Sequence, residues 1–432
     1  MTATGRSYDI LLWKNKIWES RVSNSGDLAI IRNTFLKLKE QIPEARLHML
    51  TDDPEHVARE YGVEGHPVAL LRRPSRLTAL LRRMDLVILG GGTVFQDNYF
   101  VGVIPINLSI PMLAKALGTR TACNAVGVGS DREVSRLGRL LCRLAVPRFD
   151  SISVRDAESR RILEGWTKGG PPVHVTTDMA VDLPAVEFER IEPTLLEEGV
   201  DLAAHDTVAI AARKVFHHEK SWLYFLPSSI RHRLGLQSRA NQRRLEDFKS
   251  TLAKVCDDIV ERYGVKVLFV PFYSSGGALD SRNQPTPKRL FSSGDNVFAE
   301  HVASRMTRRE DVHILQRSYA PQEMLAVISR CQALIGVPYH SVVFAASQNV
   351  PVIGIDYVSK VGRYLRTVGQ GDFAVEAGAP REAFGHTFDR LWKGRERISG
   401  ELELRNTELR ALSDENIRII KDMLQQGRHD IA

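Results

Sequence analysis

The sequence predicts an α/β fold in which two Rossmann-like domains face each other across a cleft, followed by a helical C-terminal segment. Short apolar runs rich in β-branched residues alternate with stretches of helical spacing, a pattern typical of parallel sheets flanked by helices. The pattern runs twice and is interrupted by a proline-containing, acidic stretch at residues 184–205, which we interpret as the interdomain crossover. We therefore expect one domain over residues 1–190, a second over 191–370, and a charged helical segment over 371–432 that packs back on both.

The composition is that of a globular protein. With 432 residues, of which 43% are hydrophobic and 26% charged, the chain can bury two substantial cores. It contains no apolar run of about 18 residues. Its first residues lack the features of a signal peptide, so we expect a cytoplasmic protein. The four cysteines are widely spaced and form no CxxC pair, which argues against both a disulfide framework and a thiolate zinc site and favours reduced, buried thiols.

The net charge of +7 is compatible with three classes of acidic partner: nucleic acids, anionic membrane surfaces and phosphorylated substrates. We expect no nucleic-acid partner, because the chain lacks an RNP-type aromatic motif, zinc-finger spacing and a basic zipper. Leucines and arginines are interleaved over residues 70–84, and aromatic and basic residues over 214–240. We favour a surface helix and an ordered insertion for these segments, but a peripheral contact with the inner membrane surface remains open.

Polar turns and glycines follow the strands expected in the first half. The strand over residues 8–13 leads into a polar turn at 24–27, whose side chains either cap the following helix or contact a ligand. Three consecutive glycines at 90–92 follow another strand and let the backbone approach a ligand closely or take a positive φ. Neither these glycines nor the Gly-Val-Gly at 127–129 completes a GxGxxG motif, so a dinucleotide fingerprint is absent.

The most informative stretch covers residues 321–360, where the pattern reads helix, strand, turn, helix, strand. A crossover of this size joins parallel neighbours, so the second helix begins just beyond the carboxyl end of the strand at 333–337. His340 and Ser341 therefore lie at a helix N-terminus, where unpaired N–H groups favour an anion and where open α/β sheets bind their ligands. Arg213 follows the first strand of the second half in the same way.

Several segments, in a consistent order along residues 8–370, carry a resemblance to a known family. They read SNSGDLAI, LVILGGGTVFQD, SISVRDAESRRIL, TTDMAVDLP, VAIAAR and ALIGVPYHSVVFAASQNVPVIGIDYVSKV. Together they resemble the polysaccharide pyruvyl transferase family. The resemblance implies a GT-B-like fold and transfer of the enolpyruvyl carbon of phosphoenolpyruvate to hydroxyls of a sugar, giving a pyruvate ketal and phosphate. It also implies acceptors in cell-surface polysaccharides, often on a lipid carrier, and no cofactor beyond phosphoenolpyruvate as co-substrate.

The resemblance assigns roles to individual residues. His340 would be the general acid that protonates the methylene carbon of phosphoenolpyruvate, a task that suits an imidazole. Arg213 would hold the donor carboxylate or phosphate as a fork, and Lys360 would add charge near the phosphate. The complete donor-binding set is Arg213, Ser341, Lys360 and His217. The acceptor-binding set is Asp27, Gly90, Gly91, Gly92, Arg155 and Asp178, although Arg155 fits a salt-bridged strand end equally well.

One position departs from the family pattern. The family has an arginine two residues before the histidine, and this chain has Pro338 there. The side chain of proline binds no anion, and its backbone nitrogen has no hydrogen to donate. Either Lys214, His217, His218 or Lys360 replaces that charge, or the donor differs.

Two other functions remain consistent with the sequence. One is a glycosyltransferase of GT-B type that uses a nucleotide sugar, and the other is a non-catalytic descendant that binds a glycan or a carrier lipid. We expect no required metal, because His217 and His218 are adjacent and would point to opposite sides of an extended chain.

Overall fold

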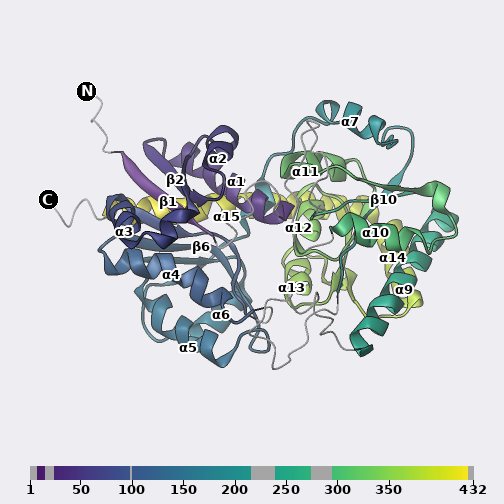
Figure 1. Ribbon diagram of the computed structural model, residues 1–432. Helices are drawn as coiled ribbons and strands as arrows, with labels where there is room; N and C mark the ends of the chain where they lie inside the picture. Colours follow the sequence, from purple (N-terminus) through teal and green to yellow (C-terminus); the bar gives the residue numbers. More distant parts are fainter. Residues whose placement is uncertain (1–6, 15–23, 98–99, 216–238, 274–293, 427–432) are drawn as a thin grey trace. The chain divides into compact units, whose positions relative to one another are not determined.

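The chain is an α/β protein, and its described residues form one eight-stranded and one six-stranded sheet, each flanked by helices (Figure 1). The computed structural model describes residues 7–14, 24–97, 100–215, 239–273 and 294–426. Every strand pair among these residues is parallel. The chain divides into two compact units: unit 1 comprises residues 1–23, 30–179 and 409–432, and unit 2 comprises residues 24–29 and 180–408.

Unit 1 is built on the sheet with strand order β3-β2-β1-β4-β6-β7-β8, while β5 pairs with β6. Strands β1, β4 and β7 are buried along their whole length, as expected for parallel strands covered on both faces. The strand order changes direction between β1 and β4. The strands are β1 (Tyr8–Trp13), β2 (Ala45–Thr51), β3 (Glu64–Pro67), β4 (Leu86–Leu89), β5 (Gly92–Phe95), β6 (Arg120–Val128), β7 (Ser151–Val154) and β8 (Val173–Val175).

Helices cover both faces of this sheet. Leucines and other apolar residues of α3, α4, α5 and α6 share one buried cluster with Ile152 and Val154 of β7. Ser153 between them points to the opposite face, where its hydroxyl donates to Asn416 of α15 at 2.7 Å. The helices are α1 (Ser25–Gln41), α2 (Pro54–Tyr61), α3 (Pro74–Arg83), α4 (Val103–Ala116), α5 (Arg136–Ala145), α6 (Ala157–Trp166) and α15 (Arg395–Gln426).

Unit 2 is built on the sheet with strand order β11-β10-β9-β12-β13-β14, which changes direction between β9 and β12. Helices α10 and α14 both pack on α9, and α12 packs between α11 and α13. The strands are β9 (Thr207–Ala211), β10 (Lys266–Phe269), β11 (Val312–Ile314), β12 (Ala333–Gly336), β13 (Val352–Asp356) and β14 (Ala374–Glu376). The helices are α7 (Glu192–Glu197), α9 (Arg239–Tyr263), α10 (Asp295–Ala303), α11 (Pro321–Ser329), α12 (Tyr339–Ser347), α13 (Lys360–Thr367) and α14 (Arg381–Lys393).

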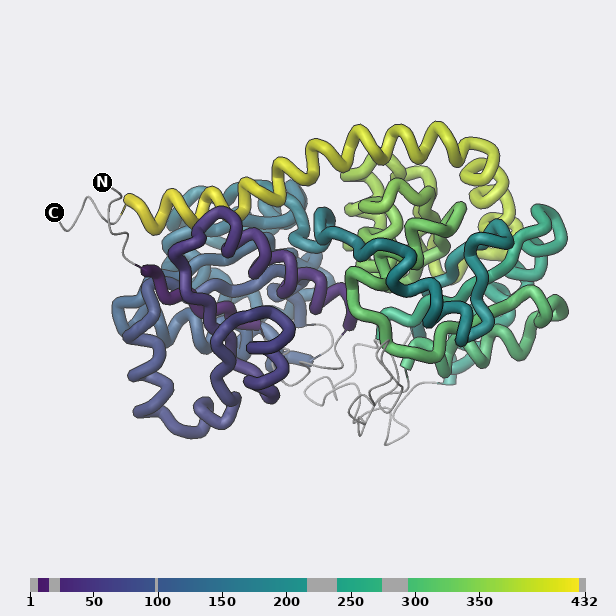
Figure 2. Tube along the Cα trace, turned by 90° about the horizontal axis from the view of Figure 1, so that it is seen from above, coloured from purple at the N-terminus to yellow at the C-terminus, as the bar shows by residue number. Residues whose placement is uncertain are grey.

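Two helices contribute to both units. The first turn of α1 belongs to unit 2 and the rest of the helix to unit 1. Helix α15 is continuous over 32 residues, as the tube in Figure 2 shows, and its residues from Leu409 onward belong to unit 1. The chain therefore crosses between the units inside regular helices as well as near Ala180.

Most of the elements that the local pattern predicts are present, although the bounds of many differ by a few residues; the strand expected over 333–337, for example, ends at Gly336. The apolar run at 266–272 predicts a strand, but β10 ends at Phe269; the amide of Val270 still donates to the carbonyl of Ile210 at 3.0 Å, and the carbonyl of Phe272 accepts from the amide of Ser25 at 2.9 Å. The pattern predicts a helix over 295–305, and α10 ends at Ala303. The pattern predicts the bounds of three elements as the structure has them: Tyr8–Trp13, Pro54–Tyr61 and Ser151–Val154.

The composition-based expectations about thiols are confirmed. All four cysteines are buried and free of disulfides, and burial raises the pKa of the Cys331 thiol to about 12. Among the residues that the structure covers, no helix combines the length and the apolar character needed to cross a bilayer.

Candidate functional site

The predicted ligand-binding edge lies where the strand order of unit 2 changes direction. Gly336, the last residue of β12, pairs with Ala211, the last residue of β9. Arg213 follows β9 by two residues, and His340 follows β12 in the first turn of α12. Both side chains therefore stand at the carboxyl ends of neighbouring strands at a topological switch point, the usual place for ligands in open α/β sheets.

The connection from β12 to α12 is tight and shaped by small residues. Pro338 is the N-cap of α12, and its carbonyl accepts hydrogen bonds from the amide of Ser341 at 2.9 Å and from the Ser341 hydroxyl at 2.6 Å. A Cβ added to Gly336 would overlap the Ser341 hydroxyl, so glycine is required at that position. Every residue of α12 is buried. The helix N-terminus, with His340 in it, is thereby fixed to the sheet.

The polar turn that precedes α1 packs directly against His340. A Cβ added to Gly26 would overlap the imidazole ring, so only glycine fits there. The side chain of Asn24 accepts from the amide of Gly26 at 3.1 Å and shapes the turn, while the amide of Ser25 binds the carbonyl of Phe272. This turn belongs to unit 2, although the sequence order suggested that it would belong to the first domain.

Arg213 forms a two-pronged ion pair with Asp295. Its Nε and Nη2 donate to the two carboxylate oxygens at 2.9 and 2.8 Å, and its guanidinium lies 5.8 Å from the centre of the Tyr273 ring. Burial by itself would lower the pKa of Arg213, but the facing Asp295 carboxylate raises it above the usual value, with smaller contributions from Tyr357 and Asp27. Arg213 thus stays charged. No hydrogen bond to a described residue uses its other three N–H groups.

An aspartate at a helix start is typical of a capping residue, but Asp295 does not cap α10. Gly294 is the N-cap, and its end of the helix is not capped by a side-chain hydrogen bond from a described residue. The carboxylate of Asp295 is 7% exposed and pairs with the partly exposed Arg213, which compensates the hydration that the carboxylate loses on burial.

An aromatic cluster connects Lys360 to His340. The ring of Tyr339 stands edge-on to those of His340 and Tyr364, with centroids 5.0 and 5.7 Å apart. Lys360, the first residue of α13, has its Nζ 5.6 Å from the centre of the Tyr339 ring. Lys214 is half-buried, and burial followed by the nearby charge of Lys249 lowers its pKa. Lys360 thus lies beside the aromatic ring that contacts His340.

A cavity of about 870 Å³ opens in unit 2 beside these elements. It lies at the carboxyl ends of β13 and β14 and the N-terminal side of α13. Arg244 of α9 lines the cavity with a positive charge, and Asp356 and Glu376 at the strand ends line it with negative charges. Tyr357 and Ser359 also line it. The cavity is thus polar and adjoins the strand-helix connection that ends in Lys360.

Close backbone packing in unit 1 explains why glycines occupy positions 90–92. They join β4 to β5, which pair with successive parts of β6. A Cβ on Gly91 would lie 3.2 Å from the carbonyl oxygen of Ala125, and Gly92 has a φ of +102°. The close approach that glycine permits is to the chain's own backbone, and contact with an acceptor stays a prediction.

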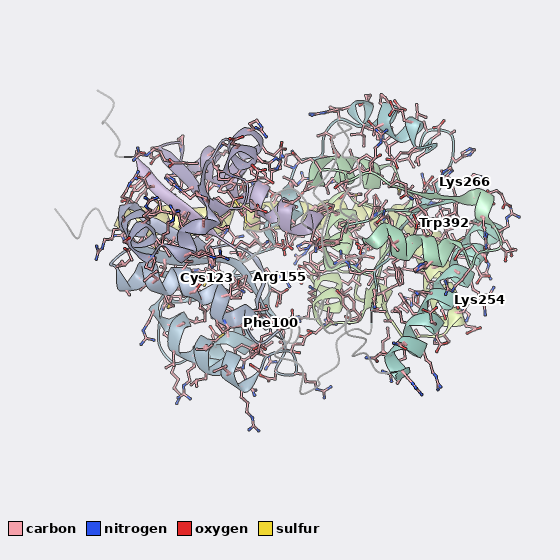
Figure 3. All side chains as sticks on the ribbon, in the orientation of Figure 1. Phe100, Cys123, Arg155, Lys254, Lys266 and Trp392 are labelled. Atoms are coloured by element: carbon pink, nitrogen blue, oxygen red, sulfur yellow. The ribbon has the colours of Figure 1, made fainter. Side chains whose placement is uncertain are left out.

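Arg155, which is labelled in Figure 3, forms a buried ion pair in unit 1. Its Nη1 donates to Asp178 at 3.1 Å and its Nη2 to the Thr93 hydroxyl at 2.9 Å. The two charged side chains are only 2% and 1% exposed. A Cβ on Gly127 would meet the guanidinium at 2.7 Å, which shows how closely it is enclosed. The structure brings the predicted residues Arg155 and Asp178 together, as partners of each other.

The structure thus brings part of the predicted site together. His340, Ser341, Arg213, Lys360 and Asp27 all belong to unit 2. His217 lies outside the described residues. Sequence reasoning missed Gly26, Tyr339 and Asp295; the glycine of the polar turn carried a usable signal, whereas nothing local to Asp295 indicates its pairing with Arg213.

Comparisons with known proteins identify solved structures that share this architecture. Solved structures that match along both chains include a protein described as a UDP-N-acetylglucosamine 2-epimerase from Listeria monocytogenes, with 10% identity, 98% of each chain covered and a TM-score of 0.62. The UDP-GlcNAc 2-epimerase from Neisseria meningitidis bound to UDP-GlcNAc matches with 9% identity over 97% of this chain and 100% of that one, at a TM-score of 0.57. A glycosyltransferase from Rickettsia africae matches with 11% identity over 97% and 99%, at a TM-score of 0.53. At these identities the likeness establishes a GT-B-like fold and nothing of the chemistry.

The sequence itself identifies the family. No curated protein sequence matches the chain. The family model described as polysaccharide pyruvyl transferase matches residues 24–359, which run from the turn that contacts His340 to the residue before Lys360. This match covers well over half of the chain, and the chain therefore belongs to the polysaccharide pyruvyl transferase family.

Proposed function

We propose that this protein transfers the pyruvyl group of phosphoenolpyruvate to two hydroxyls of a sugar in a cell-surface polysaccharide or its lipid-linked precursor, forming a pyruvate ketal. The observation that carries the proposal is the position of His340. Its imidazole lies in the first turn of α12, at the switch point of a parallel sheet, with Arg213 at the end of the neighbouring strand. A proton donor beside an anion-binding edge is what this reaction requires.

The proposed reaction balances without an oxidant or a metal. His340 gives a proton to the methylene carbon of phosphoenolpyruvate, and the oxygen of one sugar hydroxyl bonds to the central carbon. The oxygen of a second hydroxyl then bonds to the same carbon as the bond to the phosphate oxygen breaks and phosphate leaves with the electron pair. The two hydroxyl protons restore the histidine and neutralise the departing phosphate.

Three groups supply the positive potential that the donor needs. Arg213 has three N–H groups that make no hydrogen bond to a described residue. The N-terminus of α12 favours an anion through its macrodipole. Lys360, close to Tyr339, compensates for the arginine that Pro338 replaces. Ser341 is a weaker candidate, because its hydroxyl already donates to the carbonyl of Pro338.

The acceptor is proposed to be a sugar, free or lipid-linked. Within unit 2 the acidic side chain of Asp27 lies one residue from the glycine that contacts His340. It would accept a hydrogen bond from an acceptor hydroxyl and help to remove its proton. The unit 1 candidates Gly90, Gly91, Gly92, Arg155 and Asp178 would add contacts to the rest of the sugar or its carrier.

The test is release of phosphate from phosphoenolpyruvate by the purified protein, with and without a panel of simple and lipid-linked glycosides. We expect release that depends on an acceptor, and a fall by a factor on the order of 10² to 10⁴ in the His340→Ala variant. The exposed His301 on α10 provides the matched control, since His301→Ala leaves the site intact. Unchanged turnover in His340→Ala would remove this residue from the mechanism.

The same assay separates the other candidate functions. Thermal stabilisation by a nucleotide sugar, without phosphate release from phosphoenolpyruvate, would support a glycosyltransferase. Binding of a glycan or a lipid carrier without turnover of either donor would support a non-catalytic descendant. Neither outcome is compatible with the proposed pyruvyl transfer.

A further inference from the structure

Two strands at one edge of the unit 1 sheet bring two histidines and a glutamate together. In the register of β2 and β3, His48 pairs with Glu64, and His66 is two residues further along β3. Side chains two residues apart on a strand share a face, so all three side chains point to the same side of the sheet. Their ligand atoms lie within 4.8 Å of one another.

The distances between these atoms fit a small coordination sphere. The Nδ1 of His48 lies 3.1 Å from the Nε2 of His66. Oxygens of the Glu64 carboxylate lie 3.5 Å from the first nitrogen and 3.7 Å from the second. Ligands at about 2.0–2.1 Å from a tetrahedral ion are separated by about 3.3 Å. The Oε2 of Glu64 faces His48 and its Oε1 faces His66, so the two nitrogens and the carboxylate lie at about the spacing of one face of a coordination tetrahedron.

A fourth residue orients the buried histidine. The Nε2 of His48 lies 2.9 Å from the carboxylate of Asp9 on β1, which Arg46 holds from its other oxygen at 2.7 Å. A carboxylate only accepts hydrogen bonds, so Nε2 carries the proton and the lone pair of Nδ1 faces His66. A carboxylate behind the distal nitrogen of a ligating histidine is the arrangement that metal sites use to fix the tautomer and raise ligand basicity.

The site is open where an ion must enter. The side chain of His48 is 1% exposed, that of His66 14% and that of Glu64 60%. The ion would thus have a buried side and a solvent side, where water completes the coordination. Strand β3 is an edge strand, and none of its four residues is buried. Little side-chain packing therefore holds it to β2, and a bound ion would add a link between the two strands.

We propose that His48, Glu64 and His66 bind a divalent transition-metal ion of the Zn²⁺ class and that the ion clamps β3 to β2. The site shares no residue with the proposed donor-binding and acceptor-binding sets, and none of its residues belongs to the unit that carries His340.

The test uses the full chain after treatment with a chelator. Titration with Co²⁺ should give intense visible bands typical of tetrahedral coordination at one equivalent, and Zn²⁺ should displace it. The bands should be lost in His66→Gln, and Asp9→Asn should lower the affinity by about 10- to 100-fold. His174→Gln, an exposed histidine on β8 of the same sheet, should leave binding unchanged. Binding that survives in His66→Gln, or no binding at one equivalent, would overturn the proposal.

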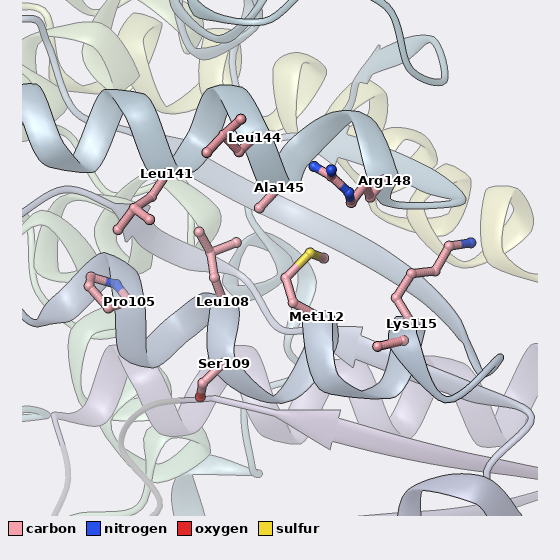
Figure 4. A pocket seen from close by; sticks show the side chains of 10 residues that line it. Pro105, Leu108, Ser109, Met112, Lys115, Leu141, Leu144, Ala145 and Arg148 are labelled. Atoms are coloured by element: carbon pink, nitrogen blue, oxygen red, sulfur yellow. The ribbon is translucent and has the colours of Figure 1, made fainter.

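A second, independent observation concerns the surface formed by α4 and α5. Between these helices lies an open apolar groove of about 630 Å³, lined by Leu108, Met112 and Leu144, with Lys115 and Arg148 at one end (Figure 4). Lys115 and Arg148 therefore lie at the edge of an apolar surface.

Helix α5 presents apolar side chains to solvent next to the groove. Leu137, Leu140 and Leu144 are each about half exposed, at 50%, 51% and 52%, and their spacing places them on one face. Arginines at 136, 139 and 143 are interleaved with them, and the helix has no acidic residue. The arginine-rich helix α3 differs, because its leucines at 77, 80 and 81 are buried in the core.

The geometry points to an anionic phospholipid surface as the occupant of this face. Leucines would enter the acyl region while arginines meet headgroup phosphates, and the groove would take one acyl chain. Arg139 already pairs with Asp131 at 3.5 Å, and an anionic bilayer would supply phosphates to the other arginines of the helix.

The test is co-sedimentation of the full chain with vesicles that contain phosphatidylglycerol, compared with vesicles of phosphatidylcholine alone. We expect binding to the first, weakened by salt, and about a tenfold lower partition for each of Leu140→Asn and Leu144→Asn. Leu404→Asn on α15, a site 75% exposed, is the control. Equal binding of all variants, absence of vesicle binding, or self-association that Leu140→Asn abolishes would each overturn the proposal.

Discussion

Gly26 lies so close to the imidazole ring of His340 that no side chain fits between them. These residues are more than 300 positions apart in the sequence, yet both belong to unit 2. The Asn24 side chain and the Phe272 carbonyl hold the turn in place. The turn therefore acts as a rigid wall for the ring of His340.

The first prediction follows from this contact. In Gly26→Ala the new methyl group must displace the His340 ring or the turn, and overpacking of this kind costs about 1–3 kcal/mol of stability. A shift of the ring by about 1 Å should lower turnover by about 10²-fold. Phosphate release and thermal unfolding measure the two effects.

Another glycine provides the control for this variant. Gly385 lies within α14 of unit 2, and a Cβ added there meets nothing within 4 Å. Gly385→Ala should keep full turnover and gain about 0.5–1 kcal/mol from helix propensity. If Gly26→Ala also keeps full turnover, the turn does not position the histidine.

The second prediction concerns Arg213 and Asp295. Arg213→Lys keeps the charge but loses the planar fork, so the KM for phosphoenolpyruvate should rise by about 10- to 100-fold with a smaller change in kcat. Asp295→Asn removes the carboxylate from a buried ion pair and should destabilise the protein by about 3 kcal/mol. Steady-state kinetics and urea unfolding measure these effects. An unchanged donor KM in Arg213→Lys would show that the guanidinium serves only the ion pair.

The elements of this fold could largely be read from local pattern. Buried parallel strands appear as short apolar runs, and Tyr8–Trp13 and Ser151–Val154 have the predicted bounds. The apolar run at Lys266 predicts a strand longer than β10, because Val270 and Phe272 are buried although β10 ends at Phe269. An apolar run in the sequence indicates buried residues, and residues can stay buried after the strand has ended.

The site was harder to predict than the elements. The placement of His340 at a helix start follows from the order of strands and helices, and it is confirmed. The packing of Gly26 on that ring is a contact between distant parts of the chain, for which no local pattern exists. Asp295 illustrates the same limit: an aspartate at a helix start usually caps the helix, but here its carboxylate pairs with the guanidinium of Arg213.

The third prediction tests how the chain compensates for Pro338. Lys360→Met should raise the KM for phosphoenolpyruvate by about tenfold, because it removes the cation beside Tyr339 and His340. Lys214→Met should change it less, since Lys214 is held near Lys249. Lys254 on α9 is exposed and serves as the control through Lys254→Met. A larger effect of Lys214→Met would transfer the role to that lysine.

The last prediction separates structure from acceptor binding at Arg155 and Asp178. Each single replacement, Arg155→Met or Asp178→Leu, removes one charge of the buried pair and should cost about 3–5 kcal/mol. The loss should be smaller in Asp178→Leu, because Asp156 lies 3.7 Å from the Nε of Arg155 and still compensates part of its charge. The double variant removes both charges and should be more stable than either single variant, as urea unfolding can measure.

The same double variant can then test whether the Arg155–Asp178 pair contacts the acceptor sugar. Its core is intact but it has lost both polar side chains, so a raised acceptor KM with an unchanged donor KM would mean that the pair also contacts the sugar. If both KM values stay at the level of the unmodified protein, the pair serves only to join the ends of β7 and β8 to Thr93. The acceptor contacts would then have to be sought in unit 2, beginning with Asp27.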